Sequence, residues 1–314
     1  LSAQGVLLGW PGAEGLVCDI GGSSMELAEL LGGGEVGQRR TSDLGPLKLM
    51  GLKGGKKAMR AHIKTRVTEL AEAFPERPER LFLVGGSWRA IARIDMERRG
   101  YPLKVLHEYR MTPKAILDSI AMIEKSDISD LRAKTGTSAE RMRLVPLAAE
   151  VLKVLVRQFK PREIAVSSYG IREGLLYEQM SETLRHRDPL IEAARHAEAS
   201  SARMPGFGRA LYHFVEPLFP RARQHKKRLI RAACLLHDVS WRAHPDYRAE
   251  VCFDNATRAN LGGLTHGERV YLVNDNEEAS FLVALDKKTG EQIWRVERDE
   301  KSNWATPFVW ENEY

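Results

Sequence analysis

The segment from residue 17 to residue 27 carries the residue types of a phosphoryl-transfer site. It reads Val-Cys-Asp-Ile-Gly-Gly-Ser-Ser-Met-Glu-Leu, so two glycines and two serines closely follow an aspartate. Glycines let backbone N–H groups approach phosphate oxygens, hydroxyls add donors, and a carboxylate can hold Mg²⁺. The segment therefore predicts a metal ligand at Asp19 and a phosphate-binding turn made of Gly21, Gly22, Ser23 and Ser24.

A plainer interpretation of the same segment is structural. Glycine pairs are common where a short buried strand turns back into a hairpin, and the residues from Gly15 to Asp19 have the apolar run of such a strand. On the glycine pair alone, the structural interpretation is favoured.

A second strand ends in glycines further along the chain. The apolar run from Leu81 to Val84 leads into Gly85, Gly86 and Ser87, and we expect Ser87 to cap a helix that extends to about Arg99. The pattern of a strand followed by a glycine turn thus occurs twice. A turn that only opens a helix is the structural alternative.

Another helix should open at Thr112-Pro113, with proline in its first turn.

A possible metal site lies in the second half of the chain. His237 and Asp238 are adjacent, with His225 before them and His244 after them. Imidazole and carboxylate groups share one or two metal ions in metal-dependent phosphohydrolases. A helix that carries one His-Asp pair by chance is the alternative, and it is favoured.

The elements that would position these residues change in type along the chain. Strands alternate with helices up to about residue 182, which predicts an α/β domain over residues 1–182. Helical spacing alone extends over residues 183–270, and residues 271–314 form a short β tail with a strand, a turn at 286–290 and a strand. We therefore predict three parts with these boundaries.

Composition narrows the classes of protein. The chain has 314 residues, a net charge of +6 and three cysteines, which argues against a disulfide framework and fits the cytoplasm. Apolar stretches are too short for a membrane span, so no membrane partner is expected. The positive charge predicts a polyanionic partner. Few aromatic residues accompany the basic ones, which argues against nucleic acid.

The phosphate-loop segment resembles that of the exopolyphosphatase/guanosine pentaphosphate phosphatase (Ppx/GppA) family. Family members carry Asp-Ile-Gly-Gly-Gly-Ser-Thr-Glu-Leu at this point, and the matching residues include Asp19, Gly21, Gly22, Ser24 and Glu26. Ser23 and Met25 replace the family's glycine and threonine. The resemblance implies an actin-like (ribonuclease H-like) fold and Mg²⁺-assisted hydrolysis of inorganic polyphosphate or guanosine pentaphosphate. It implies that Asp19 places the metal or the attacking water and that Glu26 supports the same site.

The resemblance extends through most of the first 270 residues. Residues 85–87 look like the family's second glycine turn, and residues 167–174 look like its Ser-x-x-Gly-x-Arg-Glu-Gly stretch, for which a structural role is favoured. The helical part resembles the HD-like domain of longer members, which often form homodimers. The tail resembles one repeat of a quinoprotein-type (PQQ-like) β-propeller, so we expect a foreign junction between Gly267 and Asn274.

Activity of the chain itself depends on a further residue. The family's catalytic acid is a glutamate in a Gly-x-Glu-Glu-Ala-type segment, and residues 1–6 resemble the residues just after that glutamate. The resemblance therefore implies that the acid and a first domain precede Leu1, and that this fragment is inactive or nearly so.

Two other functions remain open on the sequence. A non-catalytic polyanion-binding module would keep the loop and two basic clusters, which comprise residues 39–64 and residues 221–231. An actin-like nucleotide sensor would use the Gly85-Gly86 turn to line a base pocket.

Overall fold

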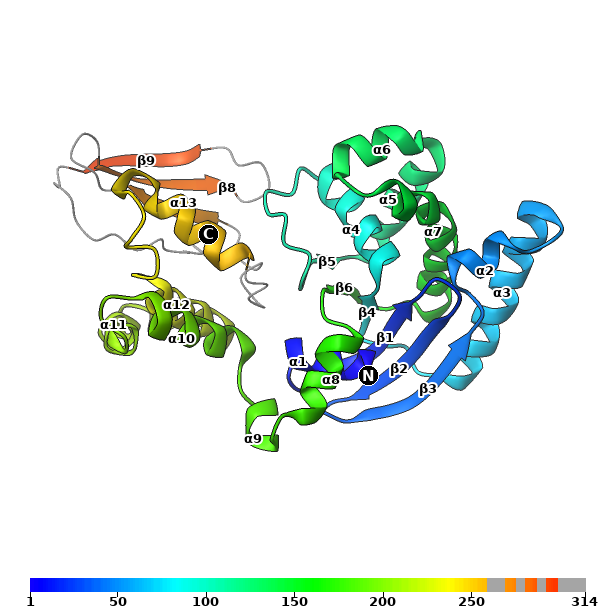
Figure 1. Ribbon diagram of the computed structural model, residues 1–314, viewed down its shortest axis with the longest axis horizontal. Helices are drawn as coiled ribbons and strands as arrows, with labels where there is room; N and C mark the ends of the chain where they lie inside the picture. Colours follow the sequence, from blue (N-terminus) through cyan, green and yellow to red (C-terminus); the bar gives the residue numbers. More distant parts are fainter. Residues whose placement is uncertain (259–268, 275–279, 287–291, 299–314) are drawn as a thin grey trace. The chain divides into compact units, whose positions relative to one another are not determined.

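The computed structural model describes residues 1–258, 269–274, 280–286 and 292–298 (Figure 1). The chain divides into two compact units. The first comprises residues 1–99 and 106–186, and the second comprises residues 100–105 and 187–314. The predicted candidate phosphate residues all lie in the first unit.

A six-stranded mixed sheet forms the centre of the first unit, in the order β3-β2-β1-β4-β6-β5. Its strands are β1 (Glu14–Ile20), β2 (Met25–Leu31), β3 (Val36–Ser42), β4 (Arg80–Val84), β5 (Arg110–Met111) and β6 (Glu163–Ser167). Strands β1, β4 and β6 run parallel, whereas β1, β2 and β3 form an antiparallel meander. The carboxyl ends of β1 and β4, each followed by a glycine turn, are therefore neighbours.

Helices cover both faces of the sheet, because its central strands are apolar on both sides. On one face, α1 (Ser2–Gly9) and α8 (Ile171–Gln179) lie together over Val17, Phe82 and Ala165 (Figure 1). The remaining helices of this unit are α2 (Pro46–Met50), α3 (Gly55–Ala73), α4 (Gly86–Arg98), α5 (Pro113–Lys125), α6 (Ile128–Thr135), α7 (Ala139–Phe159) and α9 (Glu182–Arg185). The α/β class is confirmed, while the actin-like assignment stays a prediction.

Two helix starts test the capping predictions. Thr112 caps α5 by accepting a hydrogen bond from the Ala115 N–H, with Pro113 in the first turn, as expected. The prediction that Ser87 caps α4 is wrong, because Gly85 is the capping residue. Gly85 has φ 115° and ψ 160°, a conformation that is essentially confined to glycine. Ser87 instead lies buried in the first turn of the helix.

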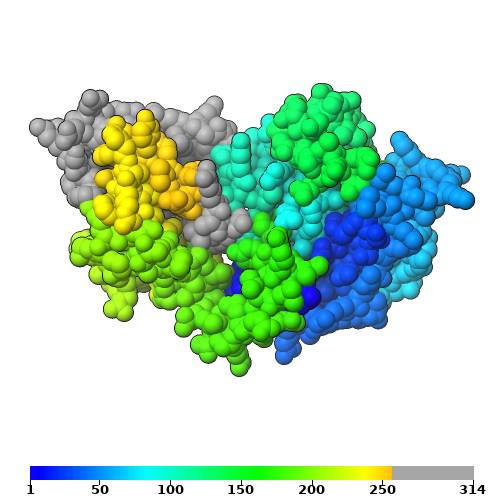
Figure 2. Space-filling model, in the orientation of Figure 1, coloured from blue at the N-terminus to red at the C-terminus, as the bar shows by residue number. Residues whose placement is uncertain are grey.

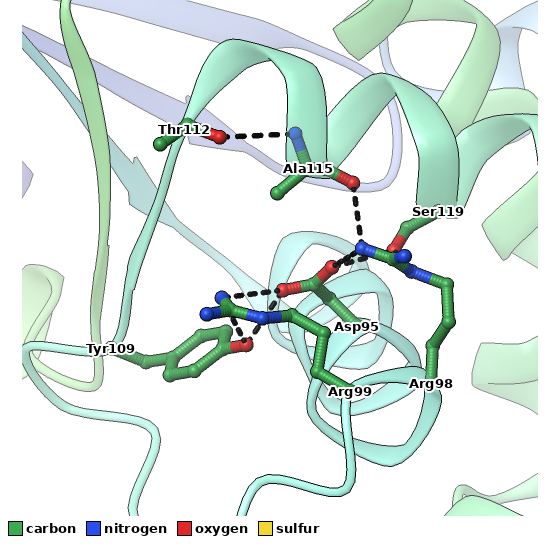
Figure 3. Close-up of polar contacts among 7 residues, drawn as sticks. All are labelled: Asp95, Arg98, Arg99, Tyr109, Thr112, Ala115 and Ser119. Carbon is green, nitrogen blue, oxygen red and sulfur yellow. Dashed lines mark hydrogen bonds and ion pairs between the residues drawn. The ribbon is translucent and has the colours of Figure 1, made fainter. Parts of the chain in front are cut away.

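A buried carboxylate joins α4 to α5 and to the segment before β5 (Figure 3). Asp95 on α4 is fully buried. It accepts hydrogen bonds from Tyr109 Oη at 2.6 Å, Ser119 Oγ at 2.7 Å and Arg98 Nη2 at 2.8 Å, and Arg99 Nη1 lies 3.5 Å away. Both carboxylate oxygens are thus satisfied, which is the condition under which a buried charge is tolerated.

From residue 187 the second unit consists first of helices. They are α10 (Pro189–Ser201), α11 (Phe207–Val215), α12 (Gln224–Leu236) and α13 (Arg248–Arg258). Leu190, Ala194, Ala232 and Leu235 form the core between α10 and α12. These helices carry the yellow-green to yellow part of the colour range in the space-filling view (Figure 2). The HD-like assignment stays a prediction.

The β tail consists of three antiparallel strands in the order β7-β8-β9. They are β7 (Arg269–Asn274), β8 (Ser280–Asp286) and β9 (Gln292–Arg298). Strands β8 and β9 occupy the positions predicted for a hairpin, whereas the turn at 286–290 lies largely outside the described residues. Strand β7 was not predicted, and it includes part of the expected junction. No helix among the described residues is long and apolar enough to span a membrane.

Candidate active site

Two carboxylates lie side by side at the carboxyl end of β1. Asp19 and Glu26 are directly opposite each other in the antiparallel register of β1 and β2. This register places their side chains on the same face, with their Cβ atoms about 5 Å apart. Burial raises the pKa of Asp19, a hydrogen bond from Ser2 Oγ opposes the rise, and the negative charge of Glu26 adds to it. The structure therefore brings together the two residues predicted to serve the same site.

The turn from Gly21 to Ser24 connects these two strands. Its first N–H, from Gly21, donates to the Ser24 carbonyl at 2.9 Å, so this N–H closes the turn rather than facing a ligand. Gly21, Gly22 and Ser23 are exposed, and Ser24 is half-buried. The exposed tip of the turn is thus formed by Gly22 and Ser23.

The fold does not require glycine at the two positions of this turn. A Cβ at Gly21 would contact the Ser24 carbonyl oxygen at an ordinary 3.5 Å, and one at Gly22 would meet only the flexible end of Leu47, at 2.9 Å. At Gly45 the opposite holds, because a Cβ there would lie 2.2 Å from the Ser23 carbonyl carbon. Sequence reasoning missed Gly45, whose lack of a side chain lets the chain before α2 pack against the turn.

An open pocket of about 630 Å³ lies beside the turn. Its lining is rich in hydroxyl and basic groups: Ser23, Ser24, Arg40, Thr41, Ser42, Asp43, Lys48, Arg66, Glu69 and Leu70. Thr41 is opposite Glu26 in the register of β2 and β3, so the pocket begins one strand beyond the carboxylate pair. Two residues of the first basic cluster, Arg40 and Lys48, line the pocket, together with Arg66, which the sequence did not indicate.

The second glycine turn adjoins the carboxylate pair. A Cβ at Gly85 would lie 2.5 Å from the Ile20 carbonyl oxygen and 3.4 Å from Asp19 Oδ1. The close approach of β1 and β4 at this point therefore depends on glycine. One turn further along α4, Arg89 Nη1 donates to the Ser168 carbonyl at 3.1 Å. Sequence reasoning did not single out Arg89, although its spacing of three from Gly86 puts it on the same helix face.

Residues 167–174 form a turn and the start of α8. Ser167 Oγ donates to the Tyr169 carbonyl at 2.8 Å, and Glu173 Oε2 accepts from the Gly170 N–H at 2.8 Å. These bonds fix the turn that presents the Ser168 carbonyl to Arg89. The favoured structural role of this stretch is consistent with these contacts.

His107 packs against the turn at residues 167–170. Its Nδ1 accepts a hydrogen bond from the Ser168 N–H at 3.3 Å, and its ring stacks on Tyr169 with 4.4 Å between centroids. The side chain is 1% exposed, and Nε2 has no hydrogen-bond partner among the described residues. Burial lowers the pKa of His107 to about 4.

We expect His107 to make the stability of the fold depend on pH. Below pH 6.5 the unfolded chain binds a proton at this residue that the folded chain resists, so the stability present above that pH is lost progressively toward pH 4. Between pH 8 and pH 5 the loss should be about 2 kcal/mol. Urea unfolding at both pH values should show a correspondingly smaller change for His107→Asn, which does not titrate. Equal changes in both proteins would contradict this assignment.

His237 and Asp238 take different partners. Arg203 binds Asp238 through Nη2 at 2.5 Å and through its backbone N–H at 3.0 Å. Burial raises the pKa of Asp238, but the hydrogen bonds from Arg203 outweigh it and the pKa is lowered. His237 Nδ1 donates to the Cys234 carbonyl at 2.8 Å. Within the described ranges, no group of three or more His, Cys, Asp or Glu residues is arranged to hold a metal.

The basic cluster at residues 221–231 is partly neutralised within the second unit. Arg228 pairs with Asp188 at 2.5 Å, and Lys227 pairs with Glu216 at 3.1 Å. These contacts tie α12 to the start of α10 and to the end of α11. At least part of the cluster therefore has a structural role.

Comparison with known proteins gives two family matches and several similar structures. Residues 1–183 match the model of the Ppx/GppA phosphatase family, and residues 190–292 match that of the exopolyphosphatase C-terminal domain. The second match includes the expected junction and part of the tail. A search of curated proteins gave no match.

Two solved structures illustrate the structural likeness. The type II variant of the Aquifex aeolicus Ppx/GppA phosphatase is 18% identical, with a TM-score of 0.49, and the match covers 57% of this chain and 62% of that one. An exopolyphosphatase from Cytophaga hutchinsonii is 20% identical, with a TM-score of 0.49 and coverages of 56% and 60%.

The chain therefore spans about three fifths of the length of these two structures. The family model itself matches more than half of the chain, including the carboxylate pair, both glycine turns and the turn at residues 167–174. On this evidence, the chain belongs to the Ppx/GppA phosphatase family.

Proposed function

We propose that this chain binds the terminal phosphates of inorganic polyphosphate or guanosine pentaphosphate and contributes to their hydrolysis by water. The observation that carries the proposal is the turn from Gly21 to Ser24. It has two glycines that the fold does not require, and it lies between a carboxylate pair and a basic pocket. A turn without side chains leaves room for phosphate oxygens to approach the backbone.

The charges around the turn suit a phosphate chain. Arg40 and Lys48 line the pocket beside it, and hydroxyls of Ser23, Ser24 and Thr41 can donate to phosphate oxygens. Arg66 also lines the pocket but is paired there with Asp43 and Glu69. Catalysis of phosphoryl transfer depends mainly on positioning and on stabilising charge. Asp19 can orient a water molecule, because its carboxylate is fixed by Ser2 Oγ.

The oxygen donors fit Mg²⁺ better than a softer metal. Asp19 and Glu26 supply two carboxylates on one face, and Mg²⁺ in phosphoryl-transfer enzymes is held by one or two carboxylates together with substrate phosphates. Burial, and to a smaller extent the charge of Glu26, raises the pKa of Asp19, and a bound cation would oppose both effects. When bound, the ion would neutralise charge on the phosphate oxygens.

Replacing Gly21 by alanine should separate binding from folding. The added methyl meets only ordinary contacts, so we expect the free energy of unfolding to change by less than about 1 kcal/mol. The methyl would occupy the surface that phosphate must approach, so affinity for long-chain polyphosphate should fall by about tenfold or more. Isothermal titration with Mg²⁺ present and urea unfolding measure the two quantities.

Several outcomes would decide between functions. Binding of polyphosphate by the wild-type chain that is insensitive to both Gly21→Ala and Asp19→Asn would contradict the proposed site. Phosphate release that requires Mg²⁺ and is lost in Asp19→Asn would support hydrolysis. Salt-sensitive binding without any release would favour the non-catalytic polyanion-binding module. Thermal stabilisation by adenosine or guanosine nucleotides but not by polyphosphate would favour the nucleotide sensor.

A further inference from the structure

Positive charge gathers at the start of α4, against the Gly85-Gly86 turn. The guanidinium of Arg141, from the first turn of α7, lies over Gly86, where a Cβ would be 2.9 Å from Arg141 Nε. On the neighbouring residue, a Cβ at Gly85 would be 3.4 Å from Asp19 Oδ1. The turn thus has the carboxylate of the candidate active site next to one residue and a guanidinium over the other.

Arg89 lies one helical turn further on, four residues after Gly85 and three after Gly86. Residues at these spacings share a helix face, so Arg89 is on the side of α4 that begins at the turn. Its Nη1 is bound to the Ser168 carbonyl, and the Ser168 N–H is in turn bound to the buried His107. This series of hydrogen bonds fixes the guanidinium while leaving its other N–H groups available in a rigid fork.

The position is unfavourable for an isolated positive charge. Among the described residues, Arg89 has no carboxylate within 4.0 Å, and neither has Arg141 or Arg93. Burial lowers the pKa of Arg89, and the charges of Arg141 and Arg93 lower it further, whereas Glu173 and Asp19 compensate only in part. A neutral residue at position 89 would therefore destabilise the fold less than the charged guanidinium does.

We propose that Arg89 binds a phosphate group of the substrate, with its guanidinium positioned by the Ser168 carbonyl and, behind it, by His107. The inference rests on the proposed function, because it assumes a phosphate chain bound beside Asp19. A bound phosphate would supply the negative charge that the arginines lack, and a guanidinium can hold two of its oxygens at once. Arg89 would then contact the substrate directly, and His107 would act only as a positioning residue.

The test compares two arginines of the same helix. Arg89→Gln removes the proposed contact, whereas Arg93→Gln makes the same chemical change one turn along, at an exposed position. Isothermal titration with inorganic tripolyphosphate and Mg²⁺ should show affinity reduced by about tenfold or more for Arg89→Gln. For Arg93→Gln it should stay within about twofold. Arg89→Lys, which keeps the charge but not the fork, should give an intermediate value.

Thermal unfolding separates this role from a structural one. Because the charge of Arg89 is poorly compensated, Arg89→Gln should leave the Tm unchanged or raise it. A clear fall in Tm, or tripolyphosphate affinity equal to that of the wild type, would overturn the assignment of Arg89 while leaving the proposed function intact. Failure of the wild-type chain to bind tripolyphosphate would overturn both.

Discussion

Replacing Asp95 by asparagine should lower the free energy of unfolding by about 3 kcal/mol, because it removes the charge at the centre of a buried polar network. Asp95 has no exposed surface and receives hydrogen bonds from Tyr109, Ser119 and Arg98 (Figure 3). An asparagine amide would turn an N–H₂ group toward one of these donors. The side chains of Arg98 and Arg99 are 26% and 37% exposed, so water can partly replace their ion pairs with Asp95. The decrease in the free energy of unfolding should therefore lie at the lower end of the range for breaking a buried ion pair.

Urea unfolding at pH 7 measures this change. Asp118→Asn is the matched control, since Asp118 is exposed on the adjacent helix α5, and the same substitution there should change stability by less than about 0.5 kcal/mol. A loss below about 1 kcal/mol for Asp95→Asn would show that the network is not required for stability. Ser119→Ala, which removes the hydroxyl donor to Asp95 and the acceptor of Arg98 Nε, should have a smaller effect of about 1 kcal/mol.

Local sequence patterns were sufficient to predict the elements that carry the candidate site. Two apolar runs that end in glycine turns become β1 and β4, and they are parallel neighbours, so both turns meet at one edge of the sheet. The two runs depend on short-range periodicity and turn chemistry, which one stretch of sequence contains in full. The pairing of β1 with β2, which places Glu26 opposite Asp19, was not predicted.

Contacts between distant residues were not predictable in this way. Arg89 and Ser168 are 79 residues apart, and Arg203 and Asp238 are 35 apart. The adjacency of His237 and Asp238 suggested shared metal ligands, yet the two side chains bond to different partners. Helix α1 has no periodic signal, because it has two turns and is buried on most sides.

The glycines show most clearly what sequence leaves undetermined. Gly21 and Gly85 both come directly after a strand, but only Gly21 was predicted to bind phosphate, whereas a structural role was favoured for Gly85. In the structure, Gly21 is not among the glycines with positive φ and has room for a Cβ, whereas Gly85 has φ 115° and a Cβ there would lie 2.5 Å from the Ile20 carbonyl oxygen. One glycine is therefore available for a ligand, and the other is required by the packing of β1 against β4.

Gly85→Ala should consequently be among the most damaging small substitutions in the chain. The backbone conformation disfavours any L side chain by about 1–3 kcal/mol, and the methyl would lie 2.5 Å from a main-chain oxygen that can move only with β1. Together these effects should lower the free energy of unfolding by about 3 kcal/mol or more. Because the displaced strand ends in Asp19 and Ile20, tripolyphosphate binding should weaken as well.

The comparison with Gly21→Ala makes the experiment decisive. Both variants add one methyl group at the end of a strand. Gly85→Ala should reduce stability and binding together, whereas Gly21→Ala should reduce binding alone. Urea unfolding and isothermal titration on the two proteins measure this. If Gly85→Ala were as stable as Gly21→Ala, β1 and β4 would tolerate a side chain between them. The position of Asp19 would then not depend on the second glycine turn.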